Sequence, residues 1–223
     1  MVALLVIATF IIFVLVDYYL QRRQPQRAKE VKAAEEPEGA AIPLSVVNGF
    51  KLPAHLSYHP GHTWAVQEGH QIVRIGLDDF ATRLVGQFDK LELPARGRWL
   101  RQGERAWTVA RGDHQFPMVS PIEGEVVDVN EKVLRNPALA QEDSYGAGWL
   151  LAVHSPAVEG NLKNLLHGRL AQRWLEESVG DLQAHVSPGP GTRLQDGGRA
   201  LPDLLAEVPE SQWEKLVREM FLG

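Results

Sequence analysis

Residues 106–130 read AWTVARGDHQFPMVSPIEGEVVDVN, and this stretch decides the fold. Gly112 and Asp113 separate two runs rich in apolar residues, and such a pair favours the two-residue turn of a β-hairpin. The run GEVVDVN follows a Glu-Gly turn and predicts a further strand. No lysine lies between Lys90 and Lys132, so the predicted hairpin carries no side-chain amine.

The composition indicates one folded domain with additional segments. The chain has 223 residues, of which 44% are hydrophobic, and this is enough for a core. A net charge of -5 and a pI near 5.9 give no basic surface of the kind that nucleic-acid binding needs, so we expect no nucleic-acid partner. The absence of cysteine excludes disulfides, thiolate nucleophiles, iron–sulfur ligation and most structural zinc sites.

Residues 1–20 predict a transmembrane signal anchor. Residues 2–16 are apolar except for Thr9, and the tyrosines that follow bring the run to roughly 15 to 19 residues, near the ~17–25 that a membrane-spanning helix needs. No basic residue precedes the run, whereas residues 22–29 contain several, and basic residues tend to remain on the cytoplasmic side. The side chains expected in the bilayer or its interface are Val2, Leu4, Leu5, Ile7, Phe10, Ile11, Ile12, Phe13, Leu15, Tyr18 and Tyr19.

Two other interpretations of this apolar run fit the sequence less well. A cleaved signal peptide has basic residues before the run and small residues after it, which is the reverse of this pattern. The other interpretation is a buried apolar helix of a soluble domain, and it fits less well because no polar face appears at helical spacing. We therefore expect a single-pass membrane protein whose remaining chain forms a cytoplasmic soluble domain.

The rest of the chain divides by composition into four segments. Residues 21–43 are polar and charged and predict a flexible linker, whereas residues 44–185 have the strand and helix patterns of a folded domain. Residues 186–208 are rich in proline and glycine and predict a second linker. Residues 209–223 predict a C-terminal amphipathic helix with a capping box of Ser211 and Glu214. Its apolar stripe consists of Trp213, Leu216, Val217, Met220 and Phe221.

A helix as short as this C-terminal one is marginal alone, so its apolar stripe must pack on something. Two interpretations remain open. The stripe packs on the chain's own domain, or it docks into a groove of a partner protein.

Several motifs resemble those of the glycine cleavage system H protein family. YHPGHTWAV, residues 58–66, resembles its N-terminal signature, with His62 and Trp64 at the family's His and Trp positions. The motifs that follow in the family's order are IGLDDFATRLVG at 75–86, LELPARG at 91–97, SPIEGEVVDVN at 120–130 and NPALAQEDSYGAGWLLAV at 136–153, with Ser144 replacing a usual Pro. The resemblance spans roughly residues 56–180 and implies a mainly β, lipoyl-domain-like (hybrid motif) sandwich or barrel, here preceded by one transmembrane helix.

Peripheral helices complete this expected architecture. One is predicted late in the domain, where Leu165, Leu166, Leu170, Trp174 and Leu175 fall close to one helical face. Trp99 and Trp107 are expected to fill the core, and either one, if exposed, would be an anchor for protein contact.

The resemblance also locates the position where H proteins carry their cofactor. H proteins are carriers rather than enzymes, and they hold lipoate on the lysine of a Glu-Ser-Val-Lys hairpin. The family spacing places this lysine eight residues before Pro121, where Asp113 stands, and the preceding positions read Ala110, Arg111 and Gly112. Because a carboxylate cannot form the amide that attaches lipoate, the resemblance implies that this site carries no cofactor.

The hairpin tip and four histidines are the candidates for a partner-contact, catalytic or metal-binding site. Arg111, Gly112, Asp113 and His114 form a candidate partner-contact tip. Asp113 and His114 would make an acid–base pair or half of a metal site, but a catalytic metal needs about three protein ligands. The spacings of His55, His59, His62 and His70 could suit zinc, but Pro60 and Gly61 break any helix that would align them. We therefore predict no catalytic and no metal-binding residues.

The leading functional hypothesis is a membrane-anchored, non-lipoylated docking or assembly subunit with one or more protein partners. The alternative is a carrier of glycine cleavage-type or related lipoate-dependent metabolism, modified at a lysine outside the tip such as Lys90 or Lys132. Both lysines are expected to lie far from the turn. An enzyme using Asp113, His114 and Arg111 would additionally need a pocket around the tip.

Overall fold

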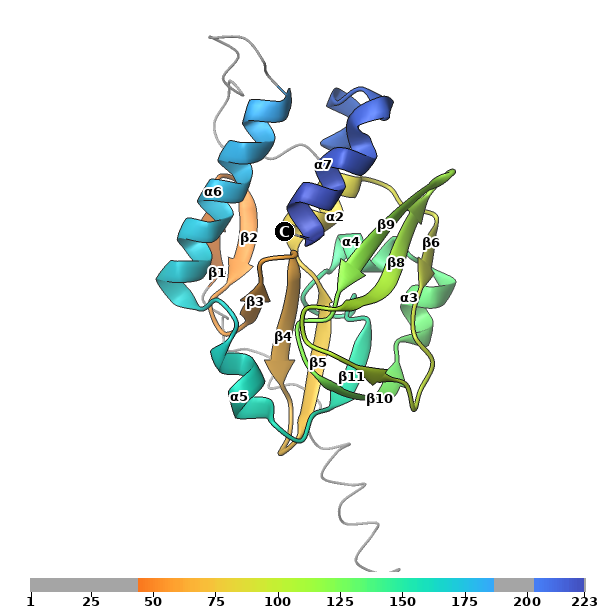
Figure 1. Cartoon of the computed structure of the whole chain (residues 1–223), viewed down its shortest axis with the longest axis vertical. Helices are drawn as coiled ribbons and strands as arrows, with labels where there is room; N and C mark the ends of the chain where they lie inside the picture. The colour runs from red at the N-terminus through yellow and green to blue at the C-terminus, as the bar shows by residue number, and fades with distance from the viewer. Residues whose placement is uncertain (1–43, 187–202, 223) are drawn as a thin grey trace, which may run out of the picture. The chain divides into compact units, whose positions relative to one another are not determined.

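The computed structural model describes residues 44–186 and 203–222 (Figure 1). The chain divides into two compact units, Met1–Ala41 and Ile42–Gly223, and all described residues belong to the second. The predicted membrane anchor, the linker at 21–43 and most of the second linker lie outside the described residues. Within the described ranges, no helix is long and apolar enough to cross a membrane.

Two sheets and one short hairpin make up the β-structure. The larger sheet has six antiparallel strands, and residues 120–130 supply one of its inner strands, as predicted. In spatial order these are β3 (Ser57–His59), β4 (Thr63–Gln67), β5 (Ile72–Leu77), β11 (Leu151–His154), β10 (Gly124–Val129) and β7 (Trp99–Leu100). The second sheet, in the order β6-β8-β9, contains β6 (Lys90–Glu92), β8 (Arg105–Arg111) and β9 (His114–Val119), and the separate hairpin contains β1 (Leu44–Val47) and β2 (Phe50–Pro53).

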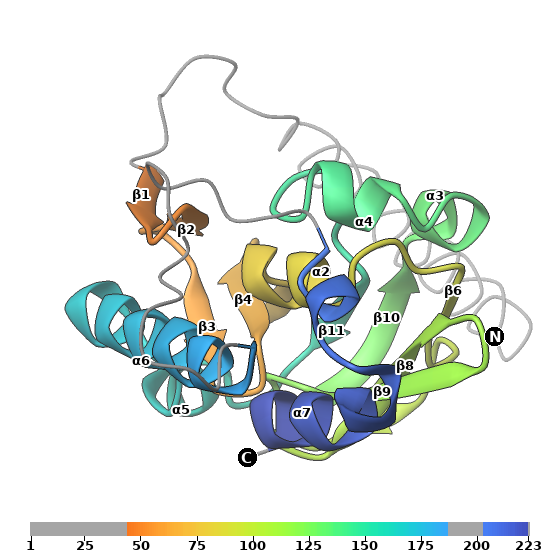
Figure 2. The ribbon, with the colours of Figure 1, turned by 90° about the horizontal axis from the view of Figure 1, so that it is seen from above.

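Helices surround these sheets. Figure 2 shows α6 and the β1–β2 hairpin on one side of the domain and the β6-β8-β9 sheet on the other. The helices are α2 (Asp79–Val85), α3 (Glu131–Arg135), α4 (Leu139–Glu142), α5 (Val158–Lys163), α6 (Gly168–Val186), the short 3₁₀ helix η1 (Leu205–Glu207) and α7 (Glu210–Leu222). Side chains from both larger sheets and from α2, α6 and α7 form one continuous apolar core. The mainly β architecture with peripheral helices is therefore confirmed.

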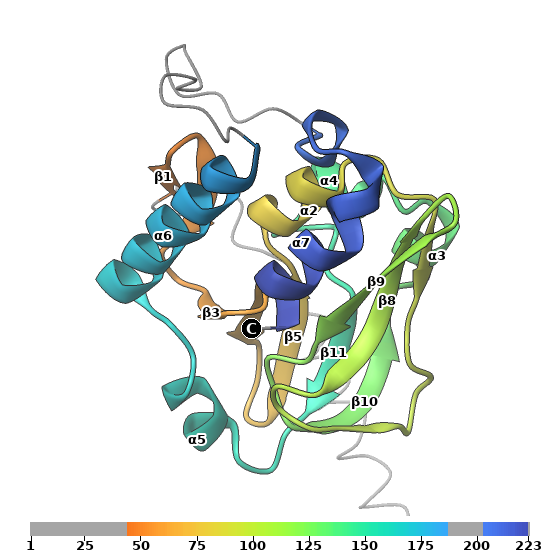
Figure 3. The same ribbon diagram turned by 45° about the horizontal axis from the view of Figure 1, so that its top comes forward.

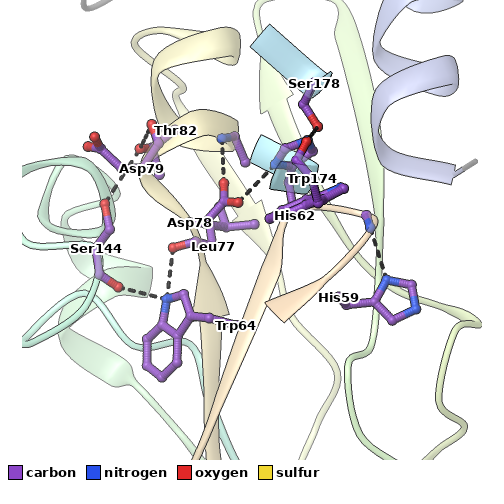
Figure 4. Close-up of polar contacts among 12 residues, drawn as sticks. His59, His62, Trp64, Leu77, Asp78, Asp79, Thr82, Ser144, Trp174 and Ser178 are labelled. Atoms are coloured by element: carbon purple, nitrogen blue, oxygen red, sulfur yellow. Dashed lines mark hydrogen bonds and ion pairs between the residues drawn. The ribbon is translucent and has the colours of Figure 1, made fainter. Parts of the chain in front are cut away.

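Trp64 on β4 links three motifs at the centre of this core. It is fully buried, and its indole Nε1 donates to the carbonyl oxygens of Leu77 at 2.8 Å and Ser144 at 3.0 Å (Figure 4). Gly76 on the neighbouring strand lies against the indole, and a Cβ at Gly76 would be 2.7 Å from the ring. Ser144 accepts this hydrogen bond through its backbone carbonyl, and the bond connects residues 136–153 to β4.

The helix α2 begins where Asp78 caps it. The Asp78 side chain accepts a hydrogen bond from the backbone N–H of Ala81 at 2.7 Å, which satisfies one of the free donors of the first turn. Its second oxygen lies 2.8 Å from Nδ1 of His62, and both side chains are buried. Because a buried charge requires a partner, this pair ties the His62 turn to the start of α2.

The C-terminal helix α7 packs on its own domain. It lies along β9 (Figure 3), and Leu216, Val217 and Phe221 of its apolar stripe are buried. Its end is inserted closely, because a Cβ at Gly61 would lie 2.5 Å from the carbonyl oxygen of Phe221. Trp213 and Met220 of the same stripe are half-buried. The interpretation in which these five residues form a free docking helix for a partner is therefore wrong in this structure.

Several local predictions need correction. The helix α7 begins at Glu210, so Ser211 lies inside the helix and does not form the predicted capping box. The second predicted linker ends earlier than expected, because Leu204, Leu205 and Val208 are buried in the core.

The predictions for the helix near residues 165–175 and for Trp99 are also partly wrong. The helix α6 begins at Gly168, so Leu165 and Leu166 precede it, and Leu170 is 64% exposed. Trp107 is buried at 3% exposure as predicted, but Trp99 is 49% exposed, because the short edge strand β7 turns it away from the core.

Replacing Phe221 by alanine tests the packing of α7. Phe221 is fully buried, so Phe221→Ala should lower the free energy of unfolding by about 3–5 kcal/mol, or roughly 10 °C in Tm, through lost contacts and a cavity. Thermal unfolding of the full chain in mild detergent, followed by circular dichroism, measures the change. The exposed Leu170→Ala variant is the control and should change stability by less than about 0.5 kcal/mol. Equal Tm values for Phe221→Ala and the unsubstituted protein would contradict the packing.

Candidate functional site at the hairpin tip

The strands β8 and β9 form the predicted hairpin. Arg111 pairs with His114, and Gly112 and Asp113 form the two-residue turn between them. Gly112 has φ +56°, a left-handed conformation that glycine adopts without strain, and it occupies the first central position, where type II′ turns require it. The sequence therefore placed the turn correctly.

Asp113 stands at the apex of the hairpin. It is exposed, and its side chain makes no hydrogen bond or ion pair with the described residues. The turn is instead held through its backbone, because the N–H of Gly112 donates to Oδ2 of Asp89 at 2.7 Å. Asp113 is thus free to meet solvent or another molecule.

Arg111 connects the hairpin to the C-terminal segment 203–222. Its Nη1 and Nη2 atoms donate to Oδ1 and Oδ2 of Asp203, both at 2.8 Å, and Nη1 also donates to the carbonyl oxygen of Val85 at 2.5 Å. The guanidinium lies 4.7 Å from the ring centroid of Trp213, within cation–π range. A bidentate pair of this kind fixes both distance and orientation, so Arg111 holds Asp203 and Trp213 against the base of the hairpin turn.

His114, on the other side of the turn, is also engaged by the same segment. Its Nε2 lies 2.7 Å from Oε1 of Glu210, and its ring is 5.1 Å from that of Trp213. The Trp213 indole is itself fixed, because its Nε1 donates to the carbonyl oxygen of Val208 at 2.8 Å. The structure thus brings the four predicted tip residues together but leaves only Gly112 and Asp113 exposed. We call this set of contacts, Arg111–Asp203, Arg111–Trp213 and His114–Glu210, the tip clamp.

Two of the four histidines named as possible ligands, His59 and His62, make structural contacts. His62 lies between the rings of Phe80, at 4.1 Å, and Trp174, at 4.5 Å. Its Nδ1 faces the carboxylate of Asp78 (Figure 4). Nδ1 of His59 accepts a hydrogen bond from the N–H of Gly61 at 3.0 Å, and burial lowers the pKa of His59, which favours the neutral ring. His55 and His70 are exposed. Within residues 44–186 and 203–222, no group of three or more His, Cys, Asp or Glu side chains could hold a metal ion.

Tyr58 is likewise a structural group in the core. Its hydroxyl donates to the carbonyl oxygen of Pro53 at 2.9 Å, and burial raises the pKa of Tyr58. A phenol that remains neutral and satisfied is a poor general base.

The two lysines proposed as alternative modification sites have different positions. Lys90 on β6 pairs with Ala110 of β8, close to the turn, and the prediction that it lies far from the hairpin turn is wrong. The pairing of β6 with β8 brings it there. Its side chain is 66% exposed, and Nζ forms an ion pair with Glu92 at 2.7 Å. Lys132 lies on α3, and its side chain is exposed.

Comparisons with known proteins identify the family. Residues 56–178 match the family model described as glycine cleavage H-protein. The chain is 32% identical over 141 residues to a probable glycine cleavage system H protein 2 of Sulfurisphaera tokodaii, covering 61% of this chain and 93% of that protein. It is 34% identical over 126 residues to the glycine cleavage system H protein of Carboxydothermus hydrogenoformans, covering 56% and 95%. A crystal structure of a glycine cleavage system H protein from Mycobacterium marinum covers 57% of this chain and 99% of its own at 26% identity, with a TM-score of 0.49.

The family model and the curated relatives show that this chain belongs to the glycine cleavage H-protein family. The resemblance inferred from the motifs is therefore confirmed. Proteins of this family are carriers and not enzymes, and this chain is accordingly not itself an enzyme.

Sequence reasoning missed Asp203 and Glu210, the two carboxylates of the tip clamp. Asp203 lies 92 positions from Arg111, and a single acidic residue at the end of a Pro/Gly-rich segment has no periodic signal. The only indication in the sequence was the apolar stripe of α7, which required a surface to pack on.

Removing the carboxylate of Asp203 tests the tip clamp. Asp203→Ala leaves the half-buried Arg111 guanidinium without its partner, so the free energy of unfolding should fall by about 1–3 kcal/mol. Amide hydrogen exchange in residues 108–116 and in α7 should become faster, and mass spectrometry of the full chain measures it.

Two further variants sharpen this test. Arg111→Lys keeps the charge but lacks the planar fork, and it should produce the same direction of change. Asp113→Ala, at the exposed apex, should leave exchange and stability within about 0.5 kcal/mol of the parent. Unchanged protection in both Asp203→Ala and Arg111→Lys would show that the clamp does not hold the tip.

Proposed function

We propose that this chain is a membrane-anchored, non-lipoylated H-protein-like subunit that docks or assembles a membrane-associated complex. The observation that carries the proposal is the hairpin tip. Asp113 stands where the family resemblance places the lipoyl lysine, and no lysine lies on the hairpin. The amide that links lipoate to a protein needs an amine, which this tip lacks.

The tip clamp supports the same proposal from geometry. A carrier arm must leave its own domain to visit several enzymes, and it therefore needs a tip that other proteins can surround. Here Arg111 and His114, which flank the turn, contact Asp203, Glu210 and Trp213 of the same chain. Any protein that surrounds the tip would have to displace these contacts or bind on top of them.

A separate exposed surface offers a place for a partner. Trp99 on β7 pairs with Glu125 of β10, at the edge of the six-stranded sheet, and is 49% exposed. Val127 on the same strand as Glu125 is 40% exposed. Exposed tryptophans are enriched among the residues that dominate binding energy at interfaces, so we assign Trp99 as the anchor of the docking surface.

The predicted membrane anchor supports a location of this domain at a membrane. The apolar residues 2–16 and the basic residues after them are the grounds for a single membrane span with a cytoplasmic domain. Tethering to a membrane raises the effective concentration of the domain around a membrane-bound partner, so a modest docking surface suffices.

A second candidate function is a carrier modified at a lysine outside the tip. Two observations favour it. The relatives named above are glycine cleavage system H proteins that match over nearly their whole length. Lys90 is exposed and lies beside the hairpin, opposite Ala110. Its position on a strand, rather than on a turn, distinguishes it from the apex lysine that the family resemblance describes.

Enzymatic lipoylation in vitro separates the two candidates. The full chain incubated with lipoate, ATP and a lipoate–protein ligase should keep its unmodified mass, because the apex lacks an amine, while an H protein with the family's hairpin lysine gains a lipoyl group in parallel. A lipoyl mass increase that disappears in Lys90→Arg and persists in Lys132→Arg would contradict the proposal and establish the carrier.

Replacement of Trp99 tests the docking surface. The full chain, purified from its native membranes in mild detergent, should bring a stoichiometric partner, and Trp99→Ala should reduce its recovery at least tenfold, as expected for a loss of about 1.4 kcal/mol or more at an anchor residue. Leu170→Ala removes a side chain that is even more exposed, on α6, and serves as the matched control. Equal recovery with Trp99→Ala and Leu170→Ala would exclude Trp99 as the anchor.

A further inference from the structure

A groove of about 620 Å³ runs beside the hairpin, away from the tip. Residues 105–108 of β8 and 115–117 of β9 form one wall, α7 forms another, and residues near 92–98 close the end. The position of α7 along β9 is visible in Figure 3. Binding sites for small molecules have volumes of about 300–1,000 Å³, so the groove has a suitable size for one.

Three arginines from separate segments line the groove. They are Arg98, Arg105 and Arg218, and within the described ranges the side chains of all three lack hydrogen-bond and ion-pair partners. Arg74, Arg96 and Arg111, by contrast, each pair with a carboxylate.

The acidic residues of the groove do not cancel this charge. Glu92 and Glu214 also line it, which leaves three positive charges against two negative ones. Glu92 already pairs with Lys90 at 2.7 Å, so its charge is offset from outside the groove. Guanidinium groups bind carboxylates and phosphates through paired hydrogen bonds, and an excess of them within one concave site favours an anion.

Trp107 provides an independent observation at the same place. It lines the groove and is only 3% exposed, yet its Nε1 has no hydrogen-bond partner. A buried donor without an acceptor costs about 1–3 kcal/mol, and only one other buried side-chain atom in the described ranges, Oγ1 of Thr63, has the same deficit. The nitrogen is covered in this structure, so contact with an acceptor in the groove requires the Trp107 side chain to move.

We propose that this groove binds a small organic anion with two or more carboxylate or phosphate groups. Arg105 of the hairpin and Arg218 of α7 hold the acidic groups from opposite walls, and Arg98 contributes from the end. The apolar side chains of Leu93, Ala106 and Pro117, which line the groove and are only partly buried, contact the body of the ligand. Because α7 supplies one wall, the site exists only while the C-terminal segment is docked.

Calorimetric titration of the full chain in mild detergent tests this site. Sodium citrate is the carboxylate probe and sodium pyrophosphate is the phosphate probe, each at ionic strength fixed with sodium chloride. At least one should bind saturably with one site per chain, and the stronger of the two identifies the acidic group that the groove prefers.

Matched variants locate the binding. Arg105→Gln and Arg218→Gln should each weaken binding at least tenfold, whereas Arg173→Gln, an exposed arginine on α6 that does not line the groove, should leave it unchanged. In a ¹⁵N spectrum, the indole N–H signal that Trp107→Phe removes should shift when the probe is added. Circular dichroism confirms that the variants are folded.

Three results would overturn the proposal. They are the absence of saturable binding for both probes, an equal loss of binding in Arg173→Gln, and an unshifted Trp107 indole signal at saturation. The second of these would assign the binding to diffuse surface charge.

Discussion

The bidentate contact between Arg111 and Asp203 is the constraint on which the functional part of the structure depends. It joins the first residue before the hairpin turn to the segment that leads into α7, and the guanidinium then serves as the platform for Trp213. With both groups half-buried, the pair keeps more of its strength than a fully exposed ion pair does. The same segment continues into α7, which packs along β9 through its buried apolar residues and carries Arg218 into the groove wall.

His62 explains how the far end of α7 is held. Its ring touches Phe80 of α2, Trp174 of α6 and Phe221 of α7, and its Nδ1 faces Asp78. One buried ring thus brings three helices together at the signature motif. This packing gives His62 a structural role that does not depend on the hairpin tip.

The sequence was sufficient where local chemistry determines structure. The turn at Gly112 and Asp113, the strand at 124–129 and the burial of Trp107 agree with the predictions made from the sequence. Trp99, in contrast, is exposed although it was expected in the core. A two-residue edge strand is too short for an alternating pattern to show which side chain points outward.

Non-local pairing could not be derived from one sequence. Lys90 approaches the hairpin only because β6 adds to β8, and Asp203 reaches Arg111 across 92 positions of chain. Neither contact leaves a periodic pattern. The four tip residues were predicted as a partner-contact surface, and the sequence did not reveal that Arg111 and His114 also contact the C-terminal segment.

We propose that this protein uses its H-protein fold without lipoate. The most direct measurement is the intact mass of the full chain purified from its native membranes. The account predicts the mass expected from the sequence with no acyl group attached. A population carrying a lipoyl group on any lysine would contradict this proposal and show that the chain is a lipoyl carrier.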